Sequence, residues 1–276
     1  MRVLLALPLC LFMHPSYPEE PLAGIESATQ LVPPSERVVD KSLPNPSTHP
    51  VAFLEACLKR YDDKKIQGYS LIFQKQERID GELKREEVVI VRFREMPYSV
   101  YFFWNQPANR DVRSALYVEG DNKGSDGKSR VKVYTSFGFK LDKAPDGAEA
   151  RTYSRYAMNT FGLRQTMQRT LDSWKEAQAE NTLGVEYLGQ EVVQEVGGRK
   201  CYKFLRPRYA RPEGDDGVSK LIIFIDCETL FQVGSIVFGR DGEKLGFYYF
   251  RDIELNPAYP PEQFTSAALG KKLDNK

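Results

Sequence analysis

Histidine is almost absent from this sequence. Its two histidines, His14 and His49, both precede the first segment with a clear hydrophobic pattern. Ser-His-Asp or Cys-His catalysis and imidazole metal sites would have to recruit one of them from the N-terminal region. We therefore expect a protein that is not an enzyme and that binds neither a metal nor a cofactor.

Cysteine is also scarce. The four cysteines, Cys10, Cys57, Cys201 and Cys227, form no C-x-x-C pair, which leaves zinc ribbons and thioredoxin-like redox sites unsupported. Cys201 and Cys227 lie at the outer ends of two strands that we expect to pair, so they are candidates for a disulfide. The alternative is that the cysteines are small buried apolar residues.

Excess charge and long hydrophobic runs are missing as well. Lys and Arg total 39 against 38 for Asp and Glu, and a net charge of +1 gives no general attraction to nucleic acid. The apolar run VLLALPLCLFM follows Met1-Arg2 and is too short to span a bilayer. It is typical of a signal peptide, although Pro8 and the lack of an A-x-A site leave cleavage unclear. We expect an exported protein of the periplasm or cell envelope, with no transmembrane span.

Composition divides the chain into four parts. Residues 1–13 are the possible signal peptide, and residues 14–49 are a Pro/Ser-rich linker with too little apolar surface to order itself. Residues 50–265 form a single domain, and residues 266–276 are expected to be a flexible C-terminal tail.

Two helices are predicted inside the domain. Apolar residues recur at helical spacing from Val51 to Tyr61, after a start at Thr48 and Pro50. A second pattern covers residues 156–178, with Asn159 or Thr160 as the cap, and its Met167, Leu171 and Trp174 face indicates core packing.

The rest of the domain reads as antiparallel strands. If Asp80-Gly81 is a two-residue turn, Leu71 opposes Ile90 and Phe73 opposes Val88. A second turn at Met96-Pro97 sets Val91 against Phe102 and Phe93 against Val100. Residues 114–119 and 130–136 form a further hairpin, residues 140–150 a connection, and residues 185–255 a five-strand meander. Both faces of the first hairpins are apolar, so both must be covered.

Charged residues give three weaker signals. A charged hairpin tip is expected, with a cross-strand ladder of Lys75, Glu77 and Arg78 against Glu82, Lys84 and Arg85. Arg92 and Arg94 interrupt an apolar strand and are expected to pair with Glu95 and Asp111, or with an acidic ligand headgroup. Asp226 and Glu228 suit a turn, and the remote alternative is a carboxylate-dependent hydrolase.

Two stretches resemble known families. FQKQERIDGEL followed by VRFREMPYSVYFFW resembles an uncharacterised bacterial family, domain of unknown function 1571. IFIDCETL, the RDG turn and FYYFRDIELNPAYPPEQF are similar to the closing hairpin of the LolA-like periplasmic lipoprotein carriers. The resemblance implies an α+β fold in which a strongly curved antiparallel sheet, an incomplete β-barrel, wraps over two main helices. It also implies an apolar concavity that shelters acyl chains in the carriers.

The expected function is to bind a hydrophobic small molecule or a lipid-modified protein in this concavity. The candidate lining consists of large apolar side chains of the predicted strands: Leu71, Phe73, Ile90, Tyr101, Phe103, Phe224, Phe238 and Phe247. The alternative is an envelope interaction module with a dry core, whose charged tip at Lys84 and Arg85 meets a protein partner. A hollow interior favours ligand binding, and a filled interior favours the interaction module.

Overall fold

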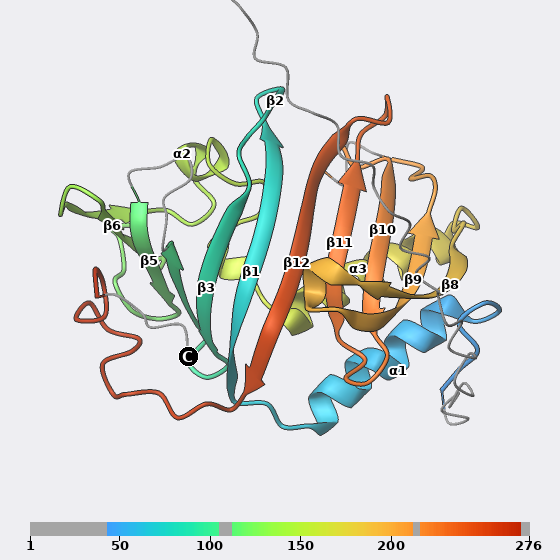
Figure 1. The fold of residues 1–276 in the computed structure, drawn as a ribbon. Helices are drawn as coiled ribbons and strands as arrows, with labels where there is room; N and C mark the ends of the chain where they lie inside the picture. Colours follow the sequence, from blue (N-terminus) through green and yellow to red (C-terminus); the bar gives the residue numbers. More distant parts are fainter. Residues whose placement is uncertain (1–42, 105–111, 212–215, 272–276) are drawn as a thin grey trace, which may run out of the picture. The chain divides into compact units, whose positions relative to one another are not determined.

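A twelve-stranded antiparallel sheet forms the body of the protein. The computed structural model describes residues 43–104, 112–211 and 216–271, all within one compact unit, residues 41–276. The strand order is β7-β6-β5-β4-β3-β1-β12-β11-β10-β9-β8, with β2 paired to β1 alone. Because β7 and β8 end the order without pairing to each other, the sheet is open. Figure 1 shows it as a curved wall, as the incomplete barrel requires.

The elements follow one another as the sequence pattern predicts in outline. Their bounds are α1 Pro50–Asp63, β1 Gly68–Ile79, β2 Glu82–Leu83, β3 Glu87–Arg94, β4 Ser99–Trp104, β5 Val112–Val118, β6 Val131–Thr135, β7 Lys140–Lys143, α2 Ala148–Arg151, η1 Met158–Thr160, α3 Leu163–Ala179, β8 Glu186–Val193, η2 Gln194–Val196, β9 Arg199–Arg206, β10 Lys220–Asp226, β11 Gln232–Phe238 and β12 Lys244–Leu255. The five-strand meander is confirmed, whereas the expected connection at 140–150 contains the edge strand β7 and most of α2.

The two main helices pack on the concave face of the sheet. Phe53 of α1 meets the rings of Tyr202 and Phe204 at 4.9 and 5.5 Å, and Trp174 of α3 meets Phe204 at 5.9 Å. Helix α1 is confirmed, with Pro50 in its first turn and His49 as N-cap. Both helices therefore bury their apolar stripes in one core beneath the β9–β10 half of the wall.

Helix α3 begins later than the periodicity predicts. Gly162 has a φ of +145°, and a Cβ there would lie 2.1 Å from Gln165 Oε1. Only glycine fits this turn comfortably, so the short helix η1 ends before it and α3 starts at Leu163. The segment before α3, residues 152–162, is consequently free to cross the concave face.

The first hairpin has a register shift that reverses one face. Ile79 opposes Glu82 as the two-residue turn predicts, but β3 pairs so that Leu71 opposes Val91 and Phe73 opposes Val89. The predicted pairing of Leu71 with Ile90 is wrong by one residue. The connection between β2 and β3, residues 84–86, contains one residue more than a continuous ladder would need. A one-residue shift moves a side chain to the opposite face. Ile90 therefore points away from Phe73.

The second turn follows the prediction. Val91 opposes Phe102, and Phe93 opposes Val100, across a cis Met96-Pro97 peptide bond. Because β4 keeps this register with the shifted β3, Tyr101 and Phe103 share the convex face with Ile90.

The convex face of this half of the sheet is covered by the C-terminal segment, residues 256–271. A second apolar cluster joins Ile90, Tyr101, Phe103 and Leu116 to Phe264, Ala268 and Leu269. The Tyr101 hydroxyl donates to the Ala268 carbonyl at 3.0 Å, and the Gly270 amide donates to Ser114 Oγ at 3.1 Å. Packing thus continues beyond residue 265, where the sequence suggested that a flexible tail begins.

Candidate functional site

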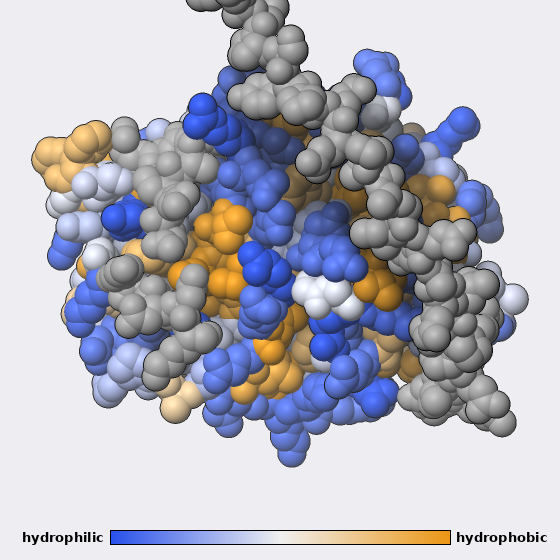
Figure 2. All heavy atoms as spheres, in the orientation of Figure 1, coloured by the Kyte–Doolittle hydropathy of each residue, from blue (hydrophilic) through white to orange (hydrophobic). Residues whose placement is uncertain are grey.

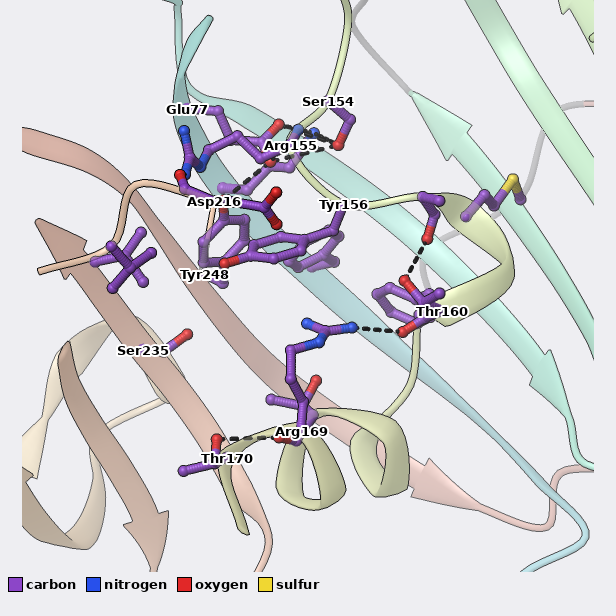
Figure 3. Close-up of a pocket in the computed structure, with 18 of the residues that line it drawn as sticks. Glu77, Ser154, Arg155, Tyr156, Thr160, Arg169, Thr170, Asp216, Ser235 and Tyr248 are labelled. Atoms are coloured by element: carbon purple, nitrogen blue, oxygen red, sulfur yellow. Dashed lines mark hydrogen bonds and ion pairs between the residues drawn. The ribbon is translucent and has the colours of Figure 1, made fainter. Parts of the chain in front are cut away.

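A cavity of about 490 Å³ lies on the concave face. Its walls come from β1, β11 and β12, from the segment before α3, and from α3 itself, as Figure 3 shows. The volume falls in the range of roughly 300–1,000 Å³ that small-molecule sites occupy. The concave face is therefore hollowed at this place, and a hollow there is the condition under which the sequence predicts ligand binding.

One side of the cavity is aromatic. Phe161, from the segment before α3, lies against Phe73 of β1 at 5.3 Å, Phe102 of β4 at 4.9 Å and Phe250 of β12 at 5.7 Å between ring centroids. These four phenylalanines, which we call the phenylalanine cluster, offer an apolar surface without hydrogen-bonding groups. Such a surface suits an aliphatic chain.

Another side holds a buried charged pair. Lys75 and Glu77 of β1 are 5% and 4% exposed, and Lys75 Nζ lies 2.5 Å from Glu77 Oε2. Tyr248 of β12 donates its hydroxyl to Glu77 Oε1 at 3.0 Å. The Arg155 amide donates to the same oxygen at 3.2 Å, and Ser154 Oγ lies 3.2 Å from both Lys75 Nζ and Glu77 Oε2. Glu77 thus ties the segment before α3 to two strands of the sheet.

These contacts decide whether the carboxyl group of Glu77 is charged. Burial alone would raise the pKa of Glu77, but the Lys75 ammonium and the hydrogen bonds from Lys75, Tyr248 and Arg155 together lower it below its ordinary value of 4.5. Burial raises the pKa of Tyr248 and of Tyr156, whose rings lie 5.4 Å apart. The carboxylate is therefore charged and the two phenols are neutral at physiological pH.

Two arginines add positive charge to the cavity wall. Arg169 of α3 stacks over the Tyr156 ring at 4.6 Å and donates to the Thr160 carbonyl at 3.1 Å, as Figure 3 shows. Arg155 donates to the backbone carbonyl of Asp216, and its buried Nε has no hydrogen-bond partner among the described residues. Within the described part of the chain neither guanidinium forms an ion pair with a carboxylate, so both could bind an anionic group.

The structure separates the eight residues of the predicted lining. Phe73 lines the cavity, and Leu71 is buried on the same concave face. Ile90, Tyr101 and Phe103 lie under the C-terminal segment on the convex face. Phe224, Phe238 and Phe247 also face away from the cavity, since side chains alternate along a strand and their neighbours Ile223, Val237 and Tyr248 point to the concave side.

Arg92 and Arg94 do not line the cavity either. Arg94 donates to Ser99 Oγ at 3.0 Å and stacks on the Phe264 ring at 4.6 Å, so it anchors the C-terminal segment. The expected pairing with Glu95 is wrong, because Glu95 accepts a hydrogen bond from the Tyr61 hydroxyl at 2.6 Å. Asp111, the other expected partner, lies outside the described residues.

The sequence reading missed the buried pair by assigning it to the hairpin tip. Lys75 and Glu77 continue the alternation of Leu71 and Phe73, which places all four side chains on the concave face. That alternation was the signal in the sequence that Lys75 and Glu77 are buried. The expected cross-strand ladder with residues 82–85 is wrong for Lys75 and Glu77. At the tip itself Lys84 pairs with Glu82.

Asp226 is a turn residue. Its Oδ1 accepts the amides of Glu228 and Thr229 at 3.0 and 2.7 Å, and Arg199 pairs with both Asp226 and Glu228. Burial would raise the pKa of Asp226, yet the hydrogen bonds from Arg199 and Thr229 lower it. Asp226 does not line the cavity, so the structure gives the hydrolase alternative no site there.

Cys201 and Cys227 are free thiols in the structure, which differs from the bridge that the sequence suggested. The register sets Cys201 opposite Asp226, one residue before Cys227. Cys201 is buried in the core, as the apolar alternative expects.

No three His, Cys, Asp or Glu side chains of the described residues come together as metal ligands. No helix in the described ranges is long and apolar enough to cross a membrane.

Known proteins provide a family match. A family described as "Protein of unknown function (DUF1571)" matches residues 66–268. No curated protein matches the chain.

Solved structures provide distant similarities. A DUF1329 family protein from Desulfovibrio piger is 11% identical, covers 78% of this chain and 97% of its own, and has a TM-score of 0.40. The lipoprotein LppX of Mycobacterium tuberculosis is 13% identical, with 75% and 97% covered and a TM-score of 0.41. The MucA/MucB complex of Pseudomonas aeruginosa gives 13% identity, 78% and 61% coverage and a TM-score of 0.42.

Proposed function

Because this chain belongs to the DUF1571 family of proteins of unknown function, we propose its function from the cavity itself. The protein binds an amphiphile, without catalysis, on the concave face of its sheet. The apolar chain of the ligand lies against the phenylalanine cluster, and its polar head lies toward Arg155 and Arg169. The ligand class is a lipid or the acyl chain of a lipid-modified protein.

The observation that carries this proposal is the two-sided character of the cavity. One apolar wall consists of Phe73, Phe102, Phe161 and Phe250, while Arg155 and Arg169, which form no ion pair with a carboxylate of the described residues, lie on another. The buried Nε of Arg155 has no hydrogen-bond partner there. A purely apolar ligand would leave the two guanidinium charges without a counter-charge, and a purely polar ligand would leave the aromatic wall in contact with water. An amphiphile satisfies both walls at once.

The cellular place belongs to the same proposal. The apolar run in residues 1–13 supports export, and a lipid carrier or sensor is of use in the cell envelope, where lipids leave one membrane for another. We therefore assign the protein to the periplasm or envelope.

Binding can be tested by filling the cavity. Ser235 of β11 is 8% exposed and points into the cavity, so Ser235→Trp should occupy the space of the ligand. We expect the unaltered protein to bind a fluorescent fatty acid from solution. It should also retain lipids in native mass spectrometry. Ser235→Trp should weaken the affinity by at least about tenfold, on the order of 1.4 kcal/mol.

The matched control is Ser125→Trp, which adds the same side chain at an exposed loop. It should bind like the unaltered protein, and melting curves will show that both variants are folded. Failure of the unaltered protein to bind any amphiphile, or equal affinity in a folded Ser235→Trp variant, would contradict the proposal.

A further inference from the structure

The turn between β6 and β7 carries two large apolar side chains in an unusual position. Phe137 is 71% exposed and Phe139 is 65% exposed, more than any other aromatic residue among the described exposed hydrophobics. Leu141, on the following strand, is 42% exposed. Figure 2 shows an orange patch at the outer end of the β5–β6 half of the molecule. None of these three residues lines the cavity.

The turn is held in one shape by its own hydrogen bonds. The Gly138 amide donates to the Thr135 carbonyl at 3.1 Å, and the Phe139 amide donates to Thr135 Oγ1 at 3.0 Å. Gly138 has a φ of +87°, which suits glycine in a tight turn. The two rings are therefore presented on a fixed turn, which lowers the entropy that binding must spend.

Basic residues stand behind the apolar tip. Residues 131–143 contain Lys132, Lys140 and Lys143 against one acid, Asp142. Lys143 forms an ion pair with Glu149 at 2.8 Å, so Lys132 and Lys140 supply the positive charge of the hairpin. Lys140 is exposed beside Phe139, and Asp142 accepts a hydrogen bond from Asn122 at 2.8 Å. A turn with apolar side chains at its tip and lysines behind them matches the layers of an anionic membrane surface, in which phosphates lie outside the acyl region.

We propose that the β6–β7 turn docks on an anionic lipid surface. Phe137 and Phe139 insert below the headgroups, and Lys132 and Lys140 lie among the phosphates. The turn is convex and lies at the edge of the sheet, since β7 is the terminal strand. A convex apex can enter a lipid layer, whereas a protein partner would need a matching pocket. The inference does not depend on what the cavity binds.

The full chain can be tested with a local reporter. Trp104 and Trp174, the native tryptophans, are buried, so Phe137→Trp places an exposed reporter at the turn. With vesicles of phosphatidylglycerol and phosphatidylcholine in equal parts, we expect a blue shift of its emission and quenching by brominated acyl chains. Pure phosphatidylcholine vesicles, or Lys140→Glu in the same protein, should reduce the quenching several-fold.

Val192→Trp is the matched control, because Val192 is 57% exposed on β8, the opposite edge of the sheet. Its emission should not change, even if another part of the chain attaches the protein to the vesicle. The proposal is overturned if position 137 is not quenched on anionic vesicles, if position 192 is quenched equally, or if quenching is independent of anionic lipid. Quenching at position 137 alone, dependent on charge, supports it.

Discussion

At the scale of single residues, the Lys75–Glu77 pair matters most. Both side chains are buried on a face that otherwise carries Leu71 and Phe73. A buried pair costs desolvation energy, so it contributes little to stability by itself, but removing one partner leaves an uncompensated charge. Its value to the protein is positional, because Glu77 holds Ser154 and Arg155 at the cavity.

Glu77→Gln should therefore destabilise the protein by about 3–5 kcal/mol, since Lys75 is left buried without a counter-charge. The free energy of unfolding from denaturant titration will measure the loss. Lys75→Met combined with Glu77→Gln removes both charges and should lose clearly less. A loss below about 1 kcal/mol in the single variant would contradict this account.

The pair also has a consequence for pH. The pKa of Glu77 is lowered from 4.5 in the folded protein, so its stabilising effect is complete above the unfolded pKa and is lost as pH falls through the folded pKa. The free energy of unfolding should fall below about pH 4.5 more steeply in the unaltered protein than in the double variant. Equal slopes would argue against Glu77 as a source of acid sensitivity.

At the scale of elements, the C-terminal segment completes the sheet. Phe264, Ala268 and Leu269 bury the convex residues Ile90 and Tyr101, which no predicted helix covers. The segment contains several turns and no regular helix or strand, so its packing depends on a few side chains.

Phe264→Ala should cost about 3 kcal/mol, because it removes a buried ring and the stacking partner of Arg94. Denaturant titration will measure this, and binding of an apolar dye should rise as the convex cluster is uncovered. Lys271→Ala, on the same segment but exposed, serves as the control and should change stability by less than about 0.5 kcal/mol. Similar losses in both variants would contradict the role given to the ring.

The elements also show how far the sequence could be read. Turn dipeptides and alternation predicted the hairpin order, and helical spacing predicted α1 and the buried face of α3. The register of β3 could not be read, because the three charged residues 84–86 give no apolar signal of the inserted residue. This shift of one residue in the register of β3 places Ile90, Tyr101 and Phe103 on the convex face, whereas we predicted them in the lining of the concavity.

The cavity was less predictable than the fold. Several of its lining residues, from Ser154 to Phe161, belong to an irregular segment, and irregular backbone has no periodicity that assigns a side chain to a face. Phe73 was identified because it lies on a strand. Arg155 and Arg169 were missed as site residues because their role depends on how the segment crosses the sheet.

At the scale of the whole molecule, the thiols report on global unfolding. Burial raises the pKa of Cys57 and Cys201 to about 12 and that of Cys227 to about 11, so thiolate is scarce in the folded state. Alkylation of these three cysteines at pH 8 should be at least about 100-fold slower in the folded protein than in denaturant. Peptide mapping by mass spectrometry will assign the sites.

The labelling also tests the bridge that the sequence suggested. Recovery of Cys201 and Cys227 as separate alkylated peptides after non-reducing denaturation agrees with free thiols. A linked peptide from oxidised material would contradict them. Fast labelling of Cys201 in the folded state would contradict its burial.

The open ends of the sheet have a mechanical consequence. In a closed barrel every strand has two neighbours, so strand number and stagger fix the diameter. Here β7 and β8 are not joined, and small changes of twist at successive strand pairs can widen or narrow the trough without breaking a ladder. We expect the width of the concave face to adjust to the thickness of the ligand that we propose. Ligands with acyl chains of different bulk should then differ in affinity less than ligands with different headgroup charge.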